Sequence, residues 1–372
     1  MNVAKKYNVK LLPLTDIHIG SGKDIEAYEY TVKAGYMYRI DMSEVFDKMS
    51  DSEKENFYKI LKKNNLFNIR SWIHDNYREE WGYIYKEKVS SDFEKYYKGK
   101  LDDKSQENSQ LSIFEFIGYN DKKYIPGSSI KGALRTAFVY SYFLENEKKY
   151  KVEKKKNEAQ IIEANILNAK KIDKNQNITG LEPKKDPFKT VKIFDTEEIE
   201  LEKFSVNVLQ IKEGNLFCEV LSGIYNEIDK LEKVNFGNEI DFEQGINFNI
   251  VSTEYSLKEN LKMGYKKSFG MKELIDSLDD KVENIINFET QKKREKDSYN
   301  IKGFYEFLKK IFDTFKNRDN NISLIRIGKY TGFNDKTINL VTEKPDEKSR
   351  TIFDENNCPM GWALIKVEEV NV

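Results

Sequence analysis

The sequence predicts an α+β protein, because short alternating strands, glycine-rich turns and amphipathic helices follow one another along all 372 residues. Apolar residues recur with period two in several segments and at helical spacing in others. Each half of the chain mixes strands with about two helices, in the manner of a ferredoxin-like sandwich, and the halves show no clear sequence repeat. We therefore expect two ferredoxin-like domains, residues 1–189 and 190–372, with helical and charged insertions.

In the first half, strands are expected on both sides of a helical insert at about residues 42–110. Residues 7–19 alternate as a strand that runs into a glycine segment, and residues 28–40 predict two strands joined by a turn at residues 33–36. Ser52 and Glu55 predict a capping box in the insert. The remaining expected elements are a strand at 113–117 and a helix opened by residues 126–129, with Ile130, Leu134, Ala137 and Phe138 on its core face.

Residues 145–174 are dense in Lys and Glu, and residues 175–189 contain Gly and Pro, so we place the domain boundary there. The second half, like the first, combines predicted strands with helices. Strands are predicted at residues 191–195, 204–211, 216–221, 240–251, 322–327 and 362–367, and a long amphipathic helix at 299–316.

Charge and composition exclude several classes of protein. Lys plus Arg number 62 and Asp plus Glu 63, which gives a net charge of -1, while 39% of the residues are hydrophobic. A packed core is therefore expected, and a free-standing, nonspecific nucleic-acid binder is disfavoured because such proteins carry a basic excess. A basic face that binds nucleic acid remains compatible with this balance.

The sequence also predicts where the protein is located and whether it holds a metal or cofactor. No apolar run approaches the roughly 20 residues that a membrane span needs, and the first residues lack a signal-peptide core, so we expect a cytoplasmic protein. Two cysteines (Cys218, Cys358) and two histidines (His18, His74) do not suffice for a usual four-ligand zinc site. We expect no metal and no cofactor.

Three segments, far apart in the sequence, place glycine next to polar, basic or aromatic residues. They span residues 17–23, 125–135 and 327–337. Our candidate RNA-binding residues are His18, Gly20, Ser21, Gly22 and Lys23 in the first, Gly127, Ser128, Ser129, Lys131, Gly132 and Arg135 in the second, and Gly328, Lys329, Tyr330, Thr331, Gly332, Phe333 and Lys336 in the third.

The second segment predicts a helix start that favours an anion, because its first amides are unpaired and the helix dipole is positive there. Lys131 and Arg135 are four residues apart and project along one side of the helix, and Gly132 keeps the surface between them low. The alternative, favoured for this segment alone, is an ordinary capped helix with two solvated cations.

The first segment offers a backbone nest at residues 20–22 and one imidazole. His18 has a pKa suited to a general base for RNA cleavage, but without a partner nearby in the sequence a hydrogen-bonded structural role is the better interpretation. In the third segment, Tyr330 and Phe333 provide rings on which bases can stack, and Lys329 and Lys336 provide cations for phosphates. Its alternative is a tight loop with packed aromatic side chains.

In this order, the three segments resemble the RAMP superfamily of CRISPR-associated proteins, and within it the family that forms the fifth subunit of the type III-A Csm effector complex. The most specific match is residues 124–136. The other matching stretches are residues 14–22, residues 191–196 (where Asp-Thr stands in place of the usual Asp-Ser), residues 328–333 and residues 359–362.

The resemblance implies two RNA-recognition-motif-like domains and a non-catalytic subunit of a ribonucleoprotein in antiviral and anti-plasmid defence. Such a subunit caps the 3′ portion of the CRISPR RNA (crRNA) and is required for maturation of its 3′ end. The implied partners are crRNA, target RNA, the other Csm subunits, especially the repeated RAMP backbone subunit, and a host trimming ribonuclease. The backbone subunit's catalytic aspartate loop has no convincing match, since Asp16 and Asp24 stand in a different context.

Three other interpretations remain open at this point. One is a RAMP-type endoribonuclease that processes precursor crRNA with His18 as general base. Another is the equivalent subunit of a type III-B complex. A protein-only scaffold is the third, and the three glycine segments disfavour it.

Overall fold

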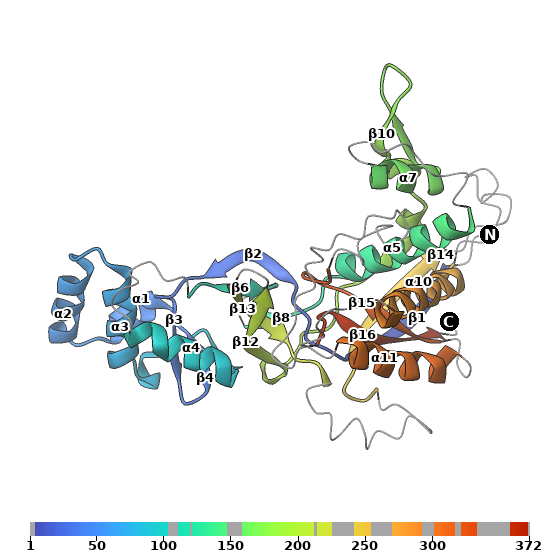
Figure 1. Cartoon of the computed structure of the whole chain (residues 1–372). Coiled ribbons are helices and arrows are strands. Elements are labelled where there is room, and N and C mark those ends of the chain that lie inside the picture. The colour runs from blue at the N-terminus through green and yellow to red at the C-terminus, as the bar shows by residue number, and fades with distance from the viewer. Residues whose placement is uncertain are drawn as a thin grey trace.

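The computed structural model describes residues 4–102, 111–119, 121–146, 158–211, 214–224, 242–253, 270–291, 301–316, 321–332 and 358–370. These residues form an α+β fold, as predicted, with two large sheets and helices packed on them (Figure 1). No helix among them is long and apolar enough to cross a membrane.

A five-stranded sheet forms one end of the molecule, with the order β11-β14-β1-β16-β15 and antiparallel pairing throughout. Its central strand is β1, so the N-terminal segment is paired on both sides by strands from the second half of the chain. The strands are β1 (Ala4–Pro13), β11 (Val191–Ile193), β14 (Ile246–Thr253), β15 (Ile322–Arg326) and β16 (Trp362–Val370).

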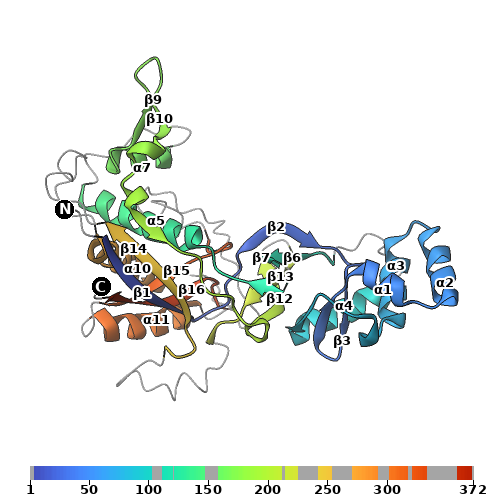
Figure 2. The same cartoon turned by 180° about the vertical axis from the view of Figure 1, so that it is seen from behind.

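Three helices cover this sheet: α5 (Gly127–Glu145), α10 (Met271–Gln291) and α11 (Ile301–Lys316) (Figure 2). Because successive strand residues face opposite sides, Val9 and Leu11 join the core under α5, whereas Leu12 joins the core under α11. The predicted apolar face of α5, which includes Ile130 and Leu134, is fully buried in the first of these cores.

The second sheet has seven strands in the order β2-β6-β13-β12-β5-β4-β3. Pairs β12–β5 and β13–β6 are parallel, and the other pairs are antiparallel. The strands are β2 (Gly20–Ile25), β3 (Tyr30–Lys33), β4 (Tyr36–Arg39), β5 (Tyr85–Val89), β6 (Ile113–Phe116), β12 (Phe204–Ile211) and β13 (Gly214–Leu221).

Most of the predicted insert folds into helices at the far end of this sheet, where α4 packs against strands β12 and β13 (Figure 1). The prediction of a helical insert was wrong for residues 85–89, which form strand β5 of the sheet because they pair with β4 and β12. Ser50 and Glu53 form the capping box of the second helix, so the prediction of Ser52 and Glu55 was wrong by two residues. The helices are α1 (Met42–Lys48), α2 (Asp51–Leu61), α3 (Leu66–Asn76) and α4 (Ser91–Asp102).

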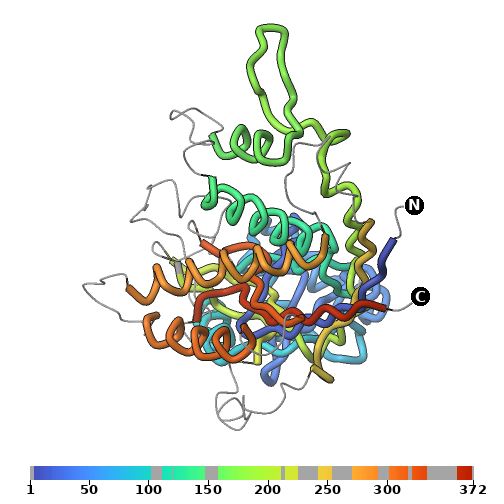
Figure 3. The backbone as a smooth tube through the Cα atoms, turned by 90° about the vertical axis from the view of Figure 1, so that its right-hand side faces the viewer, coloured from blue at the N-terminus to red at the C-terminus, as the bar shows by residue number. Residues whose placement is uncertain are grey.

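A small unit stands out from the body beside α5. It consists of α7 (Glu158–Ile166) and the hairpin of β9 (Lys170–Ile172) and β10 (Ile178–Leu181), which projects furthest in Figure 3. The remaining short elements are strands β7 (Gly118–Tyr119) and β8 (Lys122–Lys123) and single turns of 3-10 helix at Glu79–Trp81, Pro183–Lys185, Pro187–Thr190 and Leu201–Lys203.

Both sheets take strands from the two sides of residue 189. Strand β1 pairs with β14 and β16, and β5 and β6 pair with β12 and β13. The division into residues 1–189 and 190–372 stays a prediction about folding units, and the strand pairing crosses it.

Candidate nucleic-acid interface

The first and third glycine segments lie in direct contact. The backbone N–H of Lys329 donates to the carbonyl oxygen of His18 at 2.8 Å. Gly328 has φ +93, and a Cβ at this position would lie 2.6 Å from the same oxygen, so only glycine fits. The Tyr330 ring stacks on the His18 ring, with centroids 5.6 Å apart and planes inclined by 21°.

His18 is completely buried, which contradicts its predicted roles as an RNA contact and as a general base. Its Nδ1 lies 2.8 Å from the carbonyl oxygen of Glu219, so the neutral tautomer carries its proton on Nδ1 and donates it there. Burial lowers the pKa of His18, despite this hydrogen bond. The ring is therefore neutral and inaccessible to a ribose 2′-hydroxyl, and the favoured structural interpretation holds.

The predicted nest at residues 20–22 is instead the beginning of strand β2. Gly22 has φ +87, and the pairing of β2 with β6 is irregular between Gly20 and Asp24. The Ser21 hydroxyl donates to Glu115 Oε2 at 2.7 Å, so this hydroxyl already has an acidic partner. Lys23 is exposed and remains available to a phosphate.

An exposed cation lies over two aromatic rings at the edge of the third segment. The Lys329 Nζ is 5.1 Å from the Tyr330 ring centroid and 5.0 Å from that of Phe114, a strand β6 residue that sequence reasoning missed. Tyr330 has φ +71, a conformation that costs a residue other than glycine on the order of 1–3 kcal/mol and that is often found at binding sites. Thr331 and Gly332 continue this loop, while Phe333 and Lys336 lie outside the described residues.

The second segment opens helix α5 as predicted, but the helix start is not left open. The Gly127 N–H donates to Asp195 Oδ1 at 2.8 Å, so an internal carboxylate takes the position predicted for a phosphate. A Cβ on Gly127 would lie 2.2 Å from the carbonyl oxygen of Ile193. The motif of residues 191–196 thus locks the beginning of α5 against strand β11. Ser128 is exposed beside it, and Ser129 is half-buried.

Lys131 and Arg135, the two cations predicted on α5, differ in their partners. Arg135 is bonded to the carboxylates of Glu163 and Asp186, the latter at 2.6 Å, and these raise its pKa although burial opposes them. Its predicted role as a free cation for RNA is therefore wrong, because it fastens α7 and the turn at Asp186 to α5. Lys131 is half-buried and has no ion pair within the described residues. Gly132 is exposed, and a Cβ there would meet no atom within 4 Å.

Beneath this surface lies a buried charge cluster that the sequence did not indicate. Lys123 is bonded to Glu87 and lies 3.0 Å from Glu219, and all three side chains are almost completely buried. Tyr85 Oη and the backbone N–H of Phe116 donate to the Glu219 carboxylate at 2.7 and 2.8 Å. Burial raises the pKa of Glu87 to about 8, helped by the charge of Glu219. Glu87 therefore binds a proton more readily than an exposed glutamate does, which lowers the negative charge of the cluster.

This cluster connects the glycine segments. The Glu219 side chain binds Lys123, which lies four residues before Gly127. The backbone carbonyl of Glu219 accepts the hydrogen bond from His18. The first and third segments thus meet directly, and Lys123, two residues before the second segment, is linked to His18 through Glu219. From the sequence we also expect all three segments to line one groove for RNA, and this stays a prediction.

Two antiparallel-rich sheets, helices packed on their faces and glycine loops fixed at the junction define an α+β protein of the ferredoxin-like class. The sequence profile of the RAMP superfamily matches residues 10–361. The chain therefore belongs to the RAMP superfamily.

Relatives are found among CRISPR proteins. The chain is 26% identical over 288 residues to "CRISPR system Cms protein Csm5" of Methanocaldococcus jannaschii, a match that covers 70% of this chain and 65% of that protein. The chain thus spans just under two thirds of the length of that relative.

Two solved structures have a similar fold. One is a chain in the cryo-EM structure of a Csm-crRNA-target RNA ternary complex of a type III-A CRISPR-Cas system, with a TM-score of 0.66 and 16% identity over 98% of this chain and 100% of that one. The other is the crystal structure of T. onnurineus Csm5, with a TM-score of 0.62 and 16% identity over 96% and 99% of the two chains.

Proposed function

We propose that the chain is a crRNA-binding subunit of a type III-A CRISPR effector ribonucleoprotein, with target RNA and other Csm subunits as its partners. Membership of the RAMP superfamily and the similarity to Csm5 support this assignment. The fold is also that of a chain found in a Csm-crRNA-target RNA complex.

The observation that carries the proposal is the open surface at Gly132, beside Lys131. Glycine inside a helix costs roughly 0.5–1 kcal/mol relative to alanine, yet no described side chain or backbone atom packs on Gly132. A sugar-phosphate backbone that approaches the helix closely at this point makes use of both the missing side chain and the neighbouring ammonium group. Lys329, with the rings of Tyr330 and Phe114, provides a second place for phosphate and base contacts.

We further propose that the subunit caps the 3′ portion of crRNA, is required for maturation of the 3′ end, and does not itself cut RNA. The buried His18 supports the last point, because it removes the one general base that the sequence offered for cleavage. Trimming is then the work of a separate ribonuclease.

Affinity purification tests this function. The tagged chain, expressed together with its neighbouring Csm subunits and a CRISPR array, is expected to retain related RAMP subunits and crRNA of uniform 3′ length. Omitting the chain is expected to leave the remaining complex with longer or heterogeneous 3′ ends. A tagged chain that recovers neither RNA nor RAMP subunits contradicts the proposal.

A further inference from the structure

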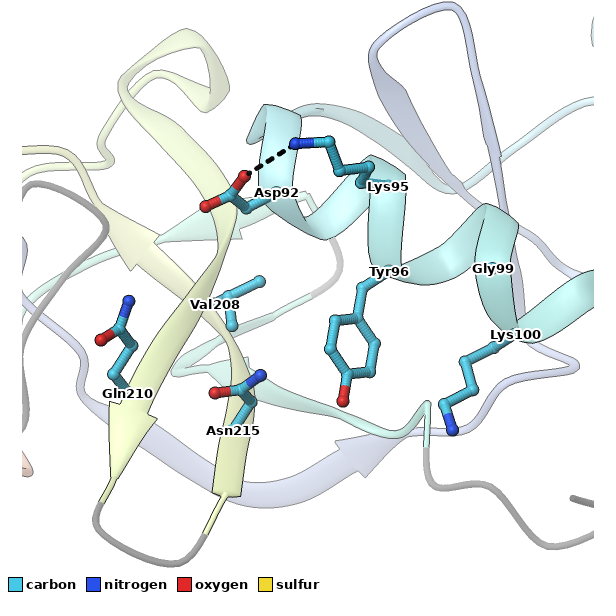
Figure 4. Close-up of a pocket in the computed structure, with 8 residues that line it drawn as sticks. All are labelled: Asp92, Lys95, Tyr96, Gly99, Lys100, Val208, Gln210 and Asn215. Carbon is cyan, nitrogen blue, oxygen red and sulfur yellow. Dashed lines mark ion pairs between the residues drawn. The ribbon is translucent and has the colours of Figure 1, made fainter.

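A pocket of about 400 Å³ lies between helix α4 and the β12–β13 hairpin, a size within the range of small-molecule sites. None of its residues belongs to the candidate interface described above. Figure 4 shows the eight residues that line it: Asp92, Lys95, Tyr96, Gly99, Lys100, Val208, Gln210 and Asn215.

The pocket lies on the face of the seven-stranded sheet that is opposite Tyr330. Along β13, Cys218 packs in the cluster that Tyr330 covers, whereas its neighbour Phe217 packs beneath α4. Asn215 is two residues before Phe217 and therefore faces α4 as well. A ligand here is thus separated by the sheet from the interface formed by Lys329 and Tyr330.

The shape of the pocket follows from where α4 stops covering the hairpin. Val208 and Phe217 are cross-strand neighbours and are buried under the helix. In the next pair on that face, Asn215 is exposed and Gln210 is half-buried. On the helix side, a Cβ on Gly99 would meet no atom within 4 Å. The missing side chain leaves room above the two amides.

The chemistry of the lining combines an aromatic face, amides and cations. Tyr96 is 39% exposed, and its ring centroid lies 5.2 Å from that of Phe217. Its side chain points toward β13 in Figure 4. The side-chain amides of Gln210 and Asn215 form no hydrogen bond to any residue that the structure describes, so their donors and acceptors are open. Lys100 lies beside the ring, with its Nζ 5.9 Å from the ring centroid.

We propose that this pocket binds one unpaired ribonucleotide. Its base stacks on Tyr96, its polar edge bonds to Gln210 and Asn215, and its phosphates meet Lys95 and Lys100. Among the residues that the structure describes, Lys95 pairs with Asp92 at 3.7 Å on the surface, a contact that a phosphate readily replaces. That the nucleotide belongs to an RNA strand rests on the function proposed above; a free nucleotide offers the same chemistry.

The sharpest test fills the pocket without touching the core. Gly99→Leu adds a side chain where the structure has open space, and Lys98→Leu adds the same side chain to α4 at a position that does not line this pocket. Binding of a fluorescent single-stranded RNA of about four nucleotides to the full chain is measured by anisotropy. We expect about tenfold weaker binding for Gly99→Leu and Tyr96→Ala, and little change for Lys98→Leu and for Tyr96→Phe, which keeps the ring.

Competition by AMP, CMP, GMP and UMP separates the two sources. If a monophosphate displaces the RNA from the wild type but not from Gly99→Leu, the pocket is a site for a free nucleotide. If no monophosphate displaces the RNA and Gly99→Leu still weakens RNA binding, the pocket is a site for an RNA strand. Unchanged RNA and nucleotide binding in both Gly99→Leu and Tyr96→Ala overturns the pocket assignment, even where crRNA still purifies with the complex. A chain that binds a monophosphate in the pocket but recovers no crRNA overturns the proposed function and retains the pocket.

Discussion

Replacing Lys123 with methionine is expected to reduce the free energy of unfolding by about 3–5 kcal/mol. This is the loss that follows when one partner of a buried ion pair is removed. Methionine fills nearly the same space but leaves Glu87 and Glu219 facing each other without a cation. Denaturant unfolding of the full chain measures the loss. Lys122→Met is the control, because Lys122 is exposed and its ion pair with Glu198 lies on the surface. The free energy of unfolding of this control is expected to fall by less than about 1 kcal/mol.

The loss in Lys123→Met is expected to grow as the pH rises. Burial and the second carboxylate already raise the pKa of Glu87 to about 8, and removal of the ammonium raises it further. Above about pH 4.5 the folded state of both proteins binds more protons than the unfolded state, so both lose stability as the pH rises. The difference between them grows only near and above pH 8, where Glu87 ionises in the wild type but stays protonated in the variant. A variant as stable as the wild type, or one whose loss does not differ between pH 7 and pH 9, contradicts the role assigned to the cluster.

Gly127→Ala is the second change with a large expected effect. The added Cβ would lie 2.2 Å from the carbonyl oxygen of Ile193 and 2.7 Å from that of Phe194, so the beginning of α5 has to move away from β11. That movement also breaks the Gly127 hydrogen bond to Asp195. A loss of about 2–4 kcal/mol is expected from overpacking together with the lost bond.

Gly132→Ala on the same helix is the matched control, and its effect has the opposite sign. A Cβ there meets no atom, so the better helix former is expected to stabilise the fold by about 0.5–1 kcal/mol. Thermal or denaturant unfolding compares the two variants. Similar stability changes in both would contradict the packing described at the start of α5.

The sequence predicted local structure well where periodicity and turn chemistry agree. The predicted turn at Ala34 and Gly35 is formed, with φ values of 49° and 78°; glycine favours such a value and alanine does not. Strand β12 has the predicted bounds. Helix α5 begins at the predicted glycine because Pro126 and the apolar face after it act together. The extent of the strand pairing was not predictable, since nothing local indicates that β1 becomes the centre of a sheet built from the other half.

The candidate site was also predictable only in its local features. The first and third segments are in contact, and Gly328 is required there by a close approach to the His18 carbonyl. Whether a charged side chain is free, however, depends on residues distant in the sequence. Arg135 meets Glu163 and Asp186, and the Gly127 amide meets Asp195, pairings that spacing along one helix does not reveal. The buried cluster around Lys123 was invisible for the same reason.

The central claim is that the surface carrying Lys131 and Lys329 binds RNA. Binding of a single-stranded RNA to the full chain at several salt concentrations tests it, with the double variant Lys131→Ala, Lys329→Ala compared with a control, Lys62→Ala, Lys63→Ala, at exposed positions at the end of α2. We predict weaker binding for the first variant only, and a slope of log K against log salt that is shallower by roughly 0.7 for each phosphate contact removed. An unchanged affinity and slope in a folded double variant, or an equal loss in the control, would contradict the account.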